Sequence, residues 1–204
     1  MTITYEVENG LYINITNRCS NSCEFCIRKN GDGAYGSDSL WLIREPSIEE
    51  IKEDIDKRDL SKYSEVVFCG YGEPSYRLRE AREIALYIKS KVPSLPIRIN
   101  TNGHSDLIHG IDTAHLYKDA FDTVSISLNT PSPERYAEIC HPIYKEKAFF
   151  ALLVFAKNVN NYVQNTLFSV VKETLSESEL AECEKIAKDC NVTLKVRTYI
   201  PPEK

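Results

Sequence analysis

Three cysteines lie within one short segment near the start of the chain. Cys19, Cys23 and Cys26 have the spacing C-x3-C-x2-C and follow an apolar run at residues 11–16 that predicts a strand. The thiols are therefore expected on a tight loop directly after the end of that strand. Thiolates are good ligands for soft metals and for iron–sulfur clusters. Most [4Fe–4S] clusters take four cysteines, so a loop with three leaves one iron open to a substrate or cofactor.

Other uses of cysteine fit this pattern less well. A structural zinc site takes four ligands, often as two C-x2-C pairs, and the sequence has neither a second pair nor an H-x3-5-H pattern. A disulfide framework is typical of small secreted chains, whereas this chain has 204 residues and an odd number of cysteines, seven. The four other cysteines are scattered, which predicts buried, inert thiols: Cys69, Cys140, Cys183 and Cys190.

The composition is that of an ordinary globular protein. Hydrophobic residues make up 42% and charged residues 27% of the chain, and the net charge is −5. This charge gives no general attraction to nucleic acid or to an anionic membrane. The sequence has no apolar run of membrane-spanning length, and its N-terminus has no export signal. We therefore expect a cytoplasmic protein with a single domain at residues 1–204 and no C-terminal auxiliary domain.

The order of the expected elements indicates an α/β fold. Strands are predicted at residues 3–7, 11–16, 65–69, 97–101, 121–128, 165–171 and 192–200, and helices at residues 47–57, 75–91, 114–120, 133–140, 145–158 and 176–190. Asn9-Gly10 predicts a hairpin turn between the first two strands. The later alternation of strand and helix predicts a parallel sheet with crossover helices. The Gly- and Ser-rich segment 28–46 is either a lid that contacts an anionic substrate or a solvated loop.

Several predicted strands alternate between polar and apolar residues. Asn100 and Asn102 oppose Ile99, and Ser127 and Asn129 flank Leu128. If helices cover the apolar face, the polar face lines an interior that holds a ligand, because a barrel packed on both sides would be almost entirely apolar. Six such units suit an incomplete (β/α)6 barrel with a short N-terminal hairpin.

Polar or flexible residues also follow the predicted strand ends, where α/β barrels carry their chemistry. The segment 69–74 reads Cys-Gly-Tyr-Gly-Glu-Pro, and the segment 100–103 reads Asn-Thr-Asn-Gly. Ser169 and Arg197 are expected on the inward face of the last two strands. Arg197 either pairs with the carboxylate of a ligand or balances Glu73 or another acid inside the barrel.

Together these motifs resemble those of the radical S-adenosylmethionine (SAM) superfamily. C-x3-C-x2-C with an aromatic residue, here Phe25, before the third cysteine is the signature of that family. The segments 70–74 and 101–103 resemble its Gly-Gly-Glu-Pro and Thr-Asn-Gly motifs. The resemblance implies one [4Fe–4S] cluster on the three cysteines, with SAM bound to the open iron through its amino and carboxylate groups. It also implies reductive cleavage of SAM to a 5′-deoxyadenosyl radical, which abstracts hydrogen from a substrate.

The resemblance further implies a set of residues that bind SAM, and it assigns no catalytic residue. The set comprises Phe25, Gly70, Tyr71, Gly72, Glu73, Asn100, Asn102, Ser127, Asn129, Ser169 and Arg197. The sequence departs from the family at residues 166–171, where the Gly-x-Ile-x-Gly pattern is missing. The adenine contacts from that strand are therefore unassigned.

The whole chain is similar to a group known as TatD-associated radical SAM proteins. The similarity lies in segments 11–19, 26–33, 40–46, 68–74 and 97–103. It implies an enzyme with an unidentified substrate, a reductant such as flavodoxin or ferredoxin, and an association with a TatD-family nuclease. Two alternatives stay open: a non-catalytic metal- or cluster-binding protein, and a partner that senses SAM or a cluster for such a nuclease.

Overall fold

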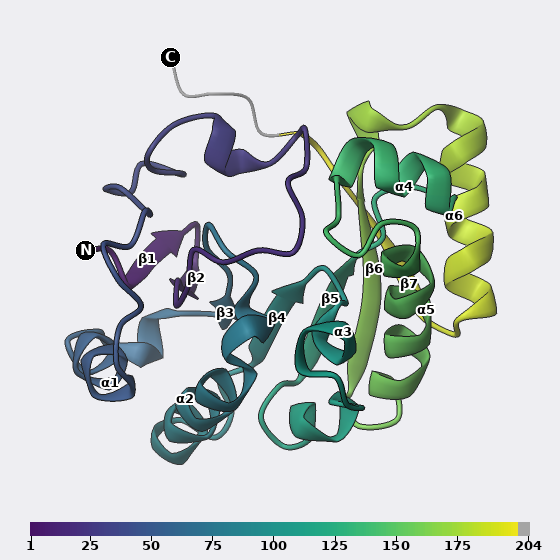
Figure 1. The fold of residues 1–204 in the computed structure, drawn as a ribbon. Coiled ribbons are helices and arrows are strands. Elements are labelled where there is room, and N and C mark those ends of the chain that lie inside the picture. The colour runs from purple at the N-terminus through teal and green to yellow at the C-terminus, as the bar shows by residue number, and fades with distance from the viewer. Residues whose placement is uncertain (200–204) are drawn as a thin grey trace.

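A single sheet runs through the part of the chain that the computed structural model describes, residues 1–199. Its seven strands are hydrogen-bonded in sequence order. They are β1 (Thr4–Val7), β2 (Gly10–Ile13), β3 (Glu65–Phe68), β4 (Ile97–Thr101), β5 (Thr123–Ser127), β6 (Asn165–Val171) and β7 (Thr193–Arg197). β1 pairs antiparallel with β2, and every later pair is parallel. Because β1 and β7 are the two edges, the sheet forms an incomplete barrel, as the alternation of strands and helices predicted (Figure 1).

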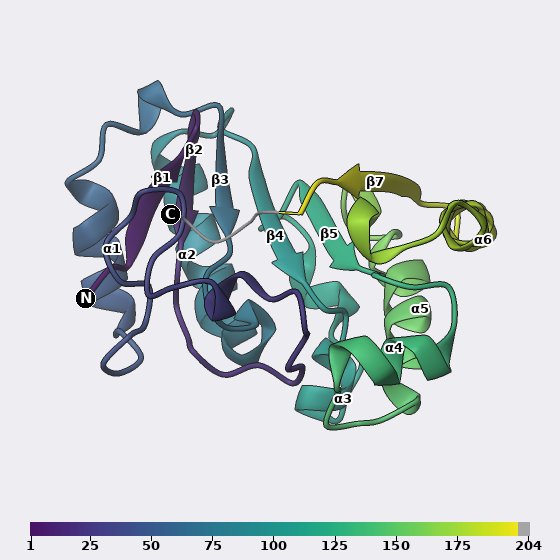
Figure 2. The same cartoon turned by 90° about the horizontal axis from the view of Figure 1, so that it is seen from above.

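Helices connect the parallel strands along the outer side of the curved sheet (Figures 1 and 2). They are α1 (Ile48–Asp56), α2 (Leu78–Lys91), α3 (Ser105–His109), α4 (Pro133–Cys140), α5 (Lys147–Val159) and α6 (Glu177–Asp189). Short 3-10 turns lie at Ile27–Lys29, Leu60–Lys62, Pro74–Arg77, Ala114–Tyr117 and Lys172–Thr174. Both predicted capping boxes form, at the starts of α1 and α6, and they satisfy backbone N–H groups there.

The strands differ from the prediction mainly at their ends. The hairpin turn is formed by Glu8 and Asn9, since Gly10 already pairs with Val7 as the first residue of β2. Glu8 takes the left-handed conformation that such a two-residue turn needs, with φ 52°. The predicted strand at 192–200 ends at Arg197, and its final residue, 200, lies outside the described part of the chain.

The two faces of the sheet divide as the alternation predicted. The outward side chains Ile13, Phe68, Ile99, Ile126 and Phe168 are almost fully buried in one core cluster with the helices. Burying each such side chain contributes about 1.5–3 kcal/mol. The inward positions of β4, β5 and β7 are mostly polar, although β3 and β6 also present Val67 and Leu167 on this side. The interior of the barrel is therefore not filled by packed apolar side chains alone.

Gly103, which ends the strand-end motif of β4, is enclosed by the core. It has φ +78°, and a Cβ there would lie 2.8 Å from Leu152 Cβ and 2.9 Å from Ile126 Cγ2. We expect Gly103→Ala to lower the free energy of unfolding by about 2–4 kcal/mol, the sum of a left-handed residue and an overpacked contact. Gly110 is the matched control, because it has φ +68° but no atom within 4 Å. Gly110→Ala should cost only about 1–2 kcal/mol.

Urea unfolding, monitored by circular dichroism, measures the free energy of unfolding of both glycine variants. An equal loss of stability in the two would contradict the close packing of Gly103 against α5.

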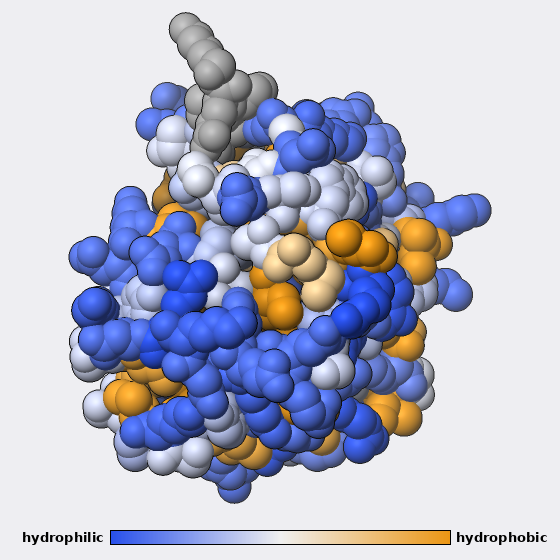
Figure 3. Space-filling view, turned by 90° about the vertical axis from the view of Figure 1, so that its left-hand side faces the viewer, coloured by the Kyte–Doolittle hydropathy of each residue, from blue (hydrophilic) through white to orange (hydrophobic). Residues whose placement is uncertain are grey.

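The surface carries mostly hydrophilic side chains, and on the face shown in Figure 3 the hydrophobic ones lie in small, separate groups. The most exposed large hydrophobic side chain is Ile43, at 90%. Trp41, in the loop of residues 28–46, packs edge-on against Tyr71 at 5.1 Å between ring centroids. Among the described residues, no helix has the length and apolar character needed to cross a membrane.

Candidate cofactor site

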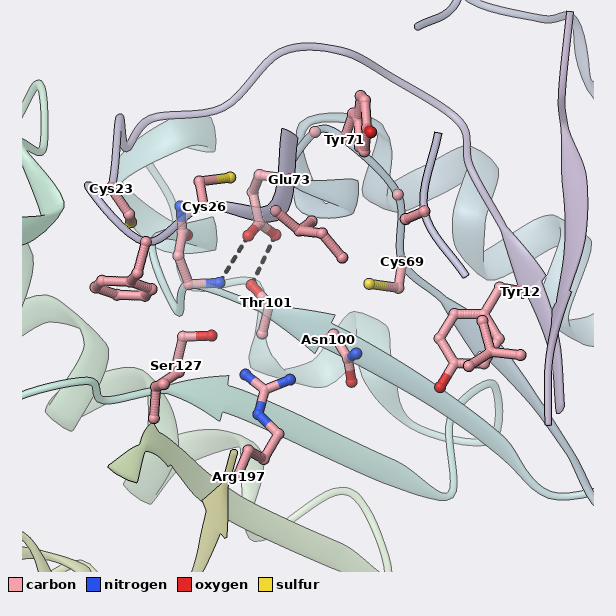
Figure 4. A pocket seen from close by; sticks show the side chains of 18 of the residues that line it. Tyr12, Cys23, Cys26, Cys69, Tyr71, Glu73, Asn100, Thr101, Ser127 and Arg197 are labelled. Atoms are coloured by element: carbon pink, nitrogen blue, oxygen red, sulfur yellow. Dashed lines mark hydrogen bonds between the residues drawn. The ribbon is translucent and has the colours of Figure 1, made fainter. Parts of the chain in front are cut away.

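A cavity of about 590 Å³ lies on the inner side of the sheet and extends from the carboxyl ends of the strands to Glu65, the first residue of β3 (Figure 4). Its walls come from the cysteine loop, the turn after β3, the ends of β4 and β5, and β7. Almost all the predicted site residues line it: Cys19, Cys23, Phe25, Cys26, Gly70, Tyr71, Gly72, Glu73, Asn100, Asn102, Ser127, Asn129 and Arg197. Ser169 does not line the cavity, because it is buried and accepts a hydrogen bond of 3.1 Å from Arg197.

The three loop cysteines share this cavity, but their thiols do not converge. Among residues 1–199, no three His, Cys, Asp or Glu side chains lie close enough together to hold a metal ion. The thiol of Cys23 lies beside the buried thiol of Cys140, and Cys23 and Cys26 point in different directions (Figure 4). Binding a cluster therefore requires a change of side-chain rotamer on this loop.

The surroundings of these thiols favour their protonated form. Burial, with a smaller effect of Glu73, raises the pKa of Cys19 to about 12. Burial also raises the pKa of Cys26. The interaction with the thiol of Cys140, followed by burial, raises the pKa of Cys23. Because iron binds the thiolate, cluster binding at this loop must release protons.

Backbone hydrogen bonds hold the cysteine loop on two sides. Three of them join it to the end of α4 and the residues that follow: Ser22 N to Cys140 O, Glu24 N to Ile139 O, and Ile143 N to Ser20 O, each 2.9 Å. On the other side, Glu73 N donates to Arg18 O at 2.7 Å. The loop is thus fixed between α4 and the turn after β3, which places its side chains over the cavity.

A buried arginine fixes the chain just before the loop. Arg77, only 7% exposed, donates from Nη1 to Ile15 O at 3.0 Å and to Pro46 O at 2.7 Å. Thr16 donates from Oγ1 to Glu45 at 2.6 Å. These contacts connect the end of β2 to the segment before α1, so the loop begins at a defined point.

Gly70 and Gly72 allow the cysteine loop to lie directly on the turn after β3. A Cβ on Gly72 would overlap the carbonyl oxygens of Thr16 and Arg18, and one on Gly70 would overlap the side chain of Asn14. The glycines are therefore required for contact between the two segments, which explains the predicted Gly-x-Gly pattern by packing.

Glu73 connects the turn after β3 to the end of β4 by hydrogen bonds. Its carboxylate accepts hydrogen bonds from Thr101 Oγ1 at 2.7 Å, Asn102 N at 2.6 Å and Ser75 N at 3.0 Å. The first two bonds are drawn in Figure 4. Burial raises the pKa of Glu73, and the three donors act against this by stabilising the charged form. Glu73 thus fixes the position of Asn102 beside the cysteine loop.

Two polar groups in the cavity have unused hydrogen-bonding capacity. Within residues 1–199, Asn100 Oδ1 and Arg197 Nε are buried and have no hydrogen-bond partner. The guanidinium of Arg197 points into the cavity (Figure 4), and no carboxylate of the described residues pairs with it. Buried polar groups without partners are costly, so both groups favour a ligand that carries a hydrogen-bond donor and an anion.

The far end of the cavity contains residues that the motifs did not indicate. Arg98 pairs with Glu65 at 2.7 Å and lies 3.4 Å from the hydroxyl of Tyr12. Cys69 also lines the cavity and is only partly buried, whereas we predicted a buried thiol. Burial of its sulfur still raises the pKa of this thiol. Arg98 could have been found from the alternation of β4, because it is on the polar face with Asn100. Glu65 gave no signal, since it is the first residue of a strand that is otherwise apolar.

His104 is a fully buried imidazole below the cysteine loop. Burial lowers its pKa from 6.5 to about 4. Because the unfolded chain binds this proton near pH 6.5 and the folded protein only near pH 4, stability falls as the pH drops through that interval. We expect the apoprotein to lose about 2 kcal/mol between pH 7 and pH 5 from this group. Urea unfolding at the two pH values measures the loss, and an equal loss in His104→Gln would contradict it.

The sequence model of a protein family, the Radical SAM superfamily, matches residues 13–185 of the chain. The protein therefore belongs to the radical SAM superfamily, a group of enzymes that use a [4Fe–4S] cluster and SAM. The sequence is also 23% identical, over 192 residues, to the GTP 3′,8-cyclases of Clostridium perfringens strains 13 and SM101. The match covers 94% of this chain but only 55% of each relative, so the chain spans about half the length of these curated proteins.

Solved structures show the same fold. Native anSMEcpe with bound AdoMet has a TM-score of 0.63 at 19% identity, with 95% of this chain and 52% of that chain covered. Streptococcus suis SuiB bound to its precursor peptide SuiA has a TM-score of 0.62 at 16% identity, with 94% and 39% covered. A radical SAM methyltransferase from Sphaerobacter thermophilus has a TM-score of 0.59 at 14% identity, with 96% and 68% covered.

The side chains of the cavity fit the two cofactors of the superfamily. Three soft donors are on one loop, as a cluster with one open iron requires. Asn100 Oδ1 offers an acceptor and Arg197 a cation, which match the ammonium and carboxylate groups of an amino acid.

Proposed function

We propose that this protein is a radical SAM enzyme that binds one [4Fe–4S] cluster through Cys19, Cys23 and Cys26. In this proposal it cleaves SAM reductively, and the resulting 5′-deoxyadenosyl radical abstracts hydrogen from a substrate that is not yet identified. The observation that carries the proposal is the position of the three thiols on a cavity that also presents an acceptor without a partner, Asn100 Oδ1, and a guanidinium whose Nε has none, that of Arg197.

Each group of residues has a distinct part in the proposal. The cysteine thiolates hold the cluster, which supplies one electron when reduced. Arg197 pairs with the carboxylate of SAM, and Asn100 accepts from its ammonium group. The backbone of the turn at 70–72 borders the same end of the cavity, and Glu73 keeps Asn102 in place. Ser127 and Asn129 lie at the end of β5 and bind the ribose hydroxyls.

An anaerobic assay tests this function. The protein is reconstituted with iron and sulfide, its metal content is measured, and SAM and dithionite are then added. We expect about four iron atoms per chain and formation of 5′-deoxyadenosine that depends on both SAM and reductant. Iron uptake and SAM binding without any 5′-deoxyadenosine, across added nucleotide and peptide substrates, would favour a sensor. Failure to take up iron would overturn the cluster assignment.

The sequence motifs also support a narrower proposal, membership of the TatD-associated group. The supporting residues are in segments 11–19, 26–33, 40–46, 68–74 and 97–103. We infer a TatD-family nuclease as a partner and flavodoxin or ferredoxin as the electron donor. Co-purification with such a nuclease, and replacement of dithionite by reduced flavodoxin or ferredoxin, test these two partners separately. Absence of a complex at micromolar concentrations of both proteins would contradict the nuclease partner.

A further inference from the structure

His104 lies at the centre of a buried hydrogen-bond network beneath the cysteine loop. Its Nδ1 is 3.0 Å from Ser20 Oγ, and its Nε2 is 3.2 Å from the hydroxyl of Tyr136. His104, Ser20 and Tyr136 are all fully buried. The imidazole thus connects a residue of the cysteine loop with α4, and it does not line the cavity itself.

Two amide side chains extend this network. Asn102 Nδ2 donates to Ser20 Oγ at 2.8 Å and lies 4.0 Å from Cys19 Sγ. On the other side, Asn21 Nδ2 donates to the hydroxyl of Tyr136 at 2.9 Å. The chain of contacts therefore crosses from the end of β4 through the loop to α4, and it passes within contact distance of one proposed cluster ligand.

His104 bonds to two hydroxyl groups at once. A neutral imidazole donates one hydrogen bond and accepts one. Ser20 and Tyr136 each already accept from an amide, so one of them donates to His104 and the other accepts from it as well. Ser20 directly follows Cys19 in the loop, and the amide of Asn102 that bonds to Ser20 also reaches Cys19 Sγ.

We propose that His104 is a positioning residue that holds the cysteine loop in place and, through Ser20, keeps the side-chain amide of Asn102 directed at the sulfur of Cys19. This inference rests on the proposed function, because there the sulfur of Cys19 is a ligand of the cluster. Hydrogen bonds to the sulfurs of an iron–sulfur site raise its reduction potential, since they stabilise the more negative, reduced state. His104 therefore affects both the order of the loop and the potential of the cluster.

The surroundings of His104 favour a bridging role over simple filling of space. Its ring packs edge-on against Tyr136 and Tyr144, with centroids 6.0 Å and 5.9 Å away. An aromatic residue of similar size could fill this position, but it could not bond to both hydroxyls. Replacing His104 by phenylalanine would leave the buried hydroxyls of Ser20 and Tyr136 each without one partner.

The first test uses the apoprotein and needs no cluster. Alkylation of each cysteine by iodoacetamide is followed by mass spectrometry in the wild type, His104→Phe, Tyr136→Phe and the exposed control His115→Gln. We expect the alkylation rates of Cys19 and Cys23 to rise about fivefold to tenfold in His104→Phe, with Cys69 unchanged as an internal reference. Circular dichroism checks that both variants are folded. Unchanged alkylation rates of Cys19 and Cys23 in both His104→Phe and Tyr136→Phe would overturn the proposal that His104 holds the loop in place.

The second test measures the reduction potential of the reconstituted cluster by dye-mediated titration. Tyr136→Phe retains the ring and removes only the hydroxyl, so a purely structural role predicts no change. We expect the equilibrium constant for reduction to fall about tenfold in His104→Phe and Tyr136→Phe, or about 59 mV for one electron. His104→Gln, which retains one donor and one acceptor, should recover part of the loss. Equal potentials in all variants would overturn the inference, whereas a wild type that takes up no iron would overturn the proposed function itself.

Discussion

Replacing Cys26 by alanine is expected to remove both the cluster and the cleavage of SAM. In the proposed function the loop supplies three thiols for a cluster that lacks a fourth protein ligand, so the loss of one leaves two. Within residues 1–199 no convergent group of His, Cys, Asp or Glu could take its place. We expect iron content to fall below about one atom per chain and 5′-deoxyadenosine to fall at least about 100-fold, to the background of the assay.

Cys183→Ala is the matched control for this variant. Cys183 is a fully buried free cysteine on α6 and does not line the cavity. Its loss should cost about 1–2 kcal/mol of stability through a small cavity and leave the iron content unchanged. Full formation of 5′-deoxyadenosine by Cys26→Ala would contradict the three-cysteine site. A fall in iron content of equal size in Cys183→Ala would mean that the effect of Cys26→Ala comes from general instability.

Much of the fold could be predicted because the local signals agree with the final packing. α4 begins at Pro133, after the N-cap Ser132, and β6 spans residues 165–171, both as predicted. The alternation on β4 and β5 correctly separated the cavity face from the core. The hairpin turn was misplaced by one residue, because Asn9-Gly10 is the usual turn pair while the register places Gly10 opposite Val7.

The candidate site could be predicted only as far as its residues form continuous motifs. The cysteine loop, the segment 70–74 and the segment 100–103 each adjoin a strand end, so parallel topology brings them together. Contacts between distant residues give no such signal. The bridge from Ser20 to His104 spans 84 positions, and the contact of Cys23 with Cys140 depends on how α4 packs. Those contacts follow from the tertiary structure alone.

The second large effect is expected at Glu73, where Glu73→Gln changes one acceptor oxygen into a donor. Both oxygens of Glu73 already accept from buried groups: Thr101 and Ser75 share one, and the backbone of Asn102 bonds to the other. In the variant an amide N–H must face one of these donors, so a buried hydrogen bond is lost. We expect the free energy of unfolding to fall by about 2–3 kcal/mol and the formation of 5′-deoxyadenosine to fall at least about tenfold.

Stability and SAM binding, measured together, separate two roles for Glu73. If Glu73 served only to bind the ammonium group of SAM, Glu73→Gln would weaken SAM binding and leave urea unfolding unchanged. The three hydrogen bonds predict instead that both change, because Asn102 and the turn after β3 lose their common anchor. Glu83→Gln is the control, since Glu83 is 52% exposed and pairs only with Lys52 on the surface; it should cost less than about 1 kcal/mol. Unchanged stability in Glu73→Gln would therefore mean that this carboxylate binds SAM and has no structural role in the site.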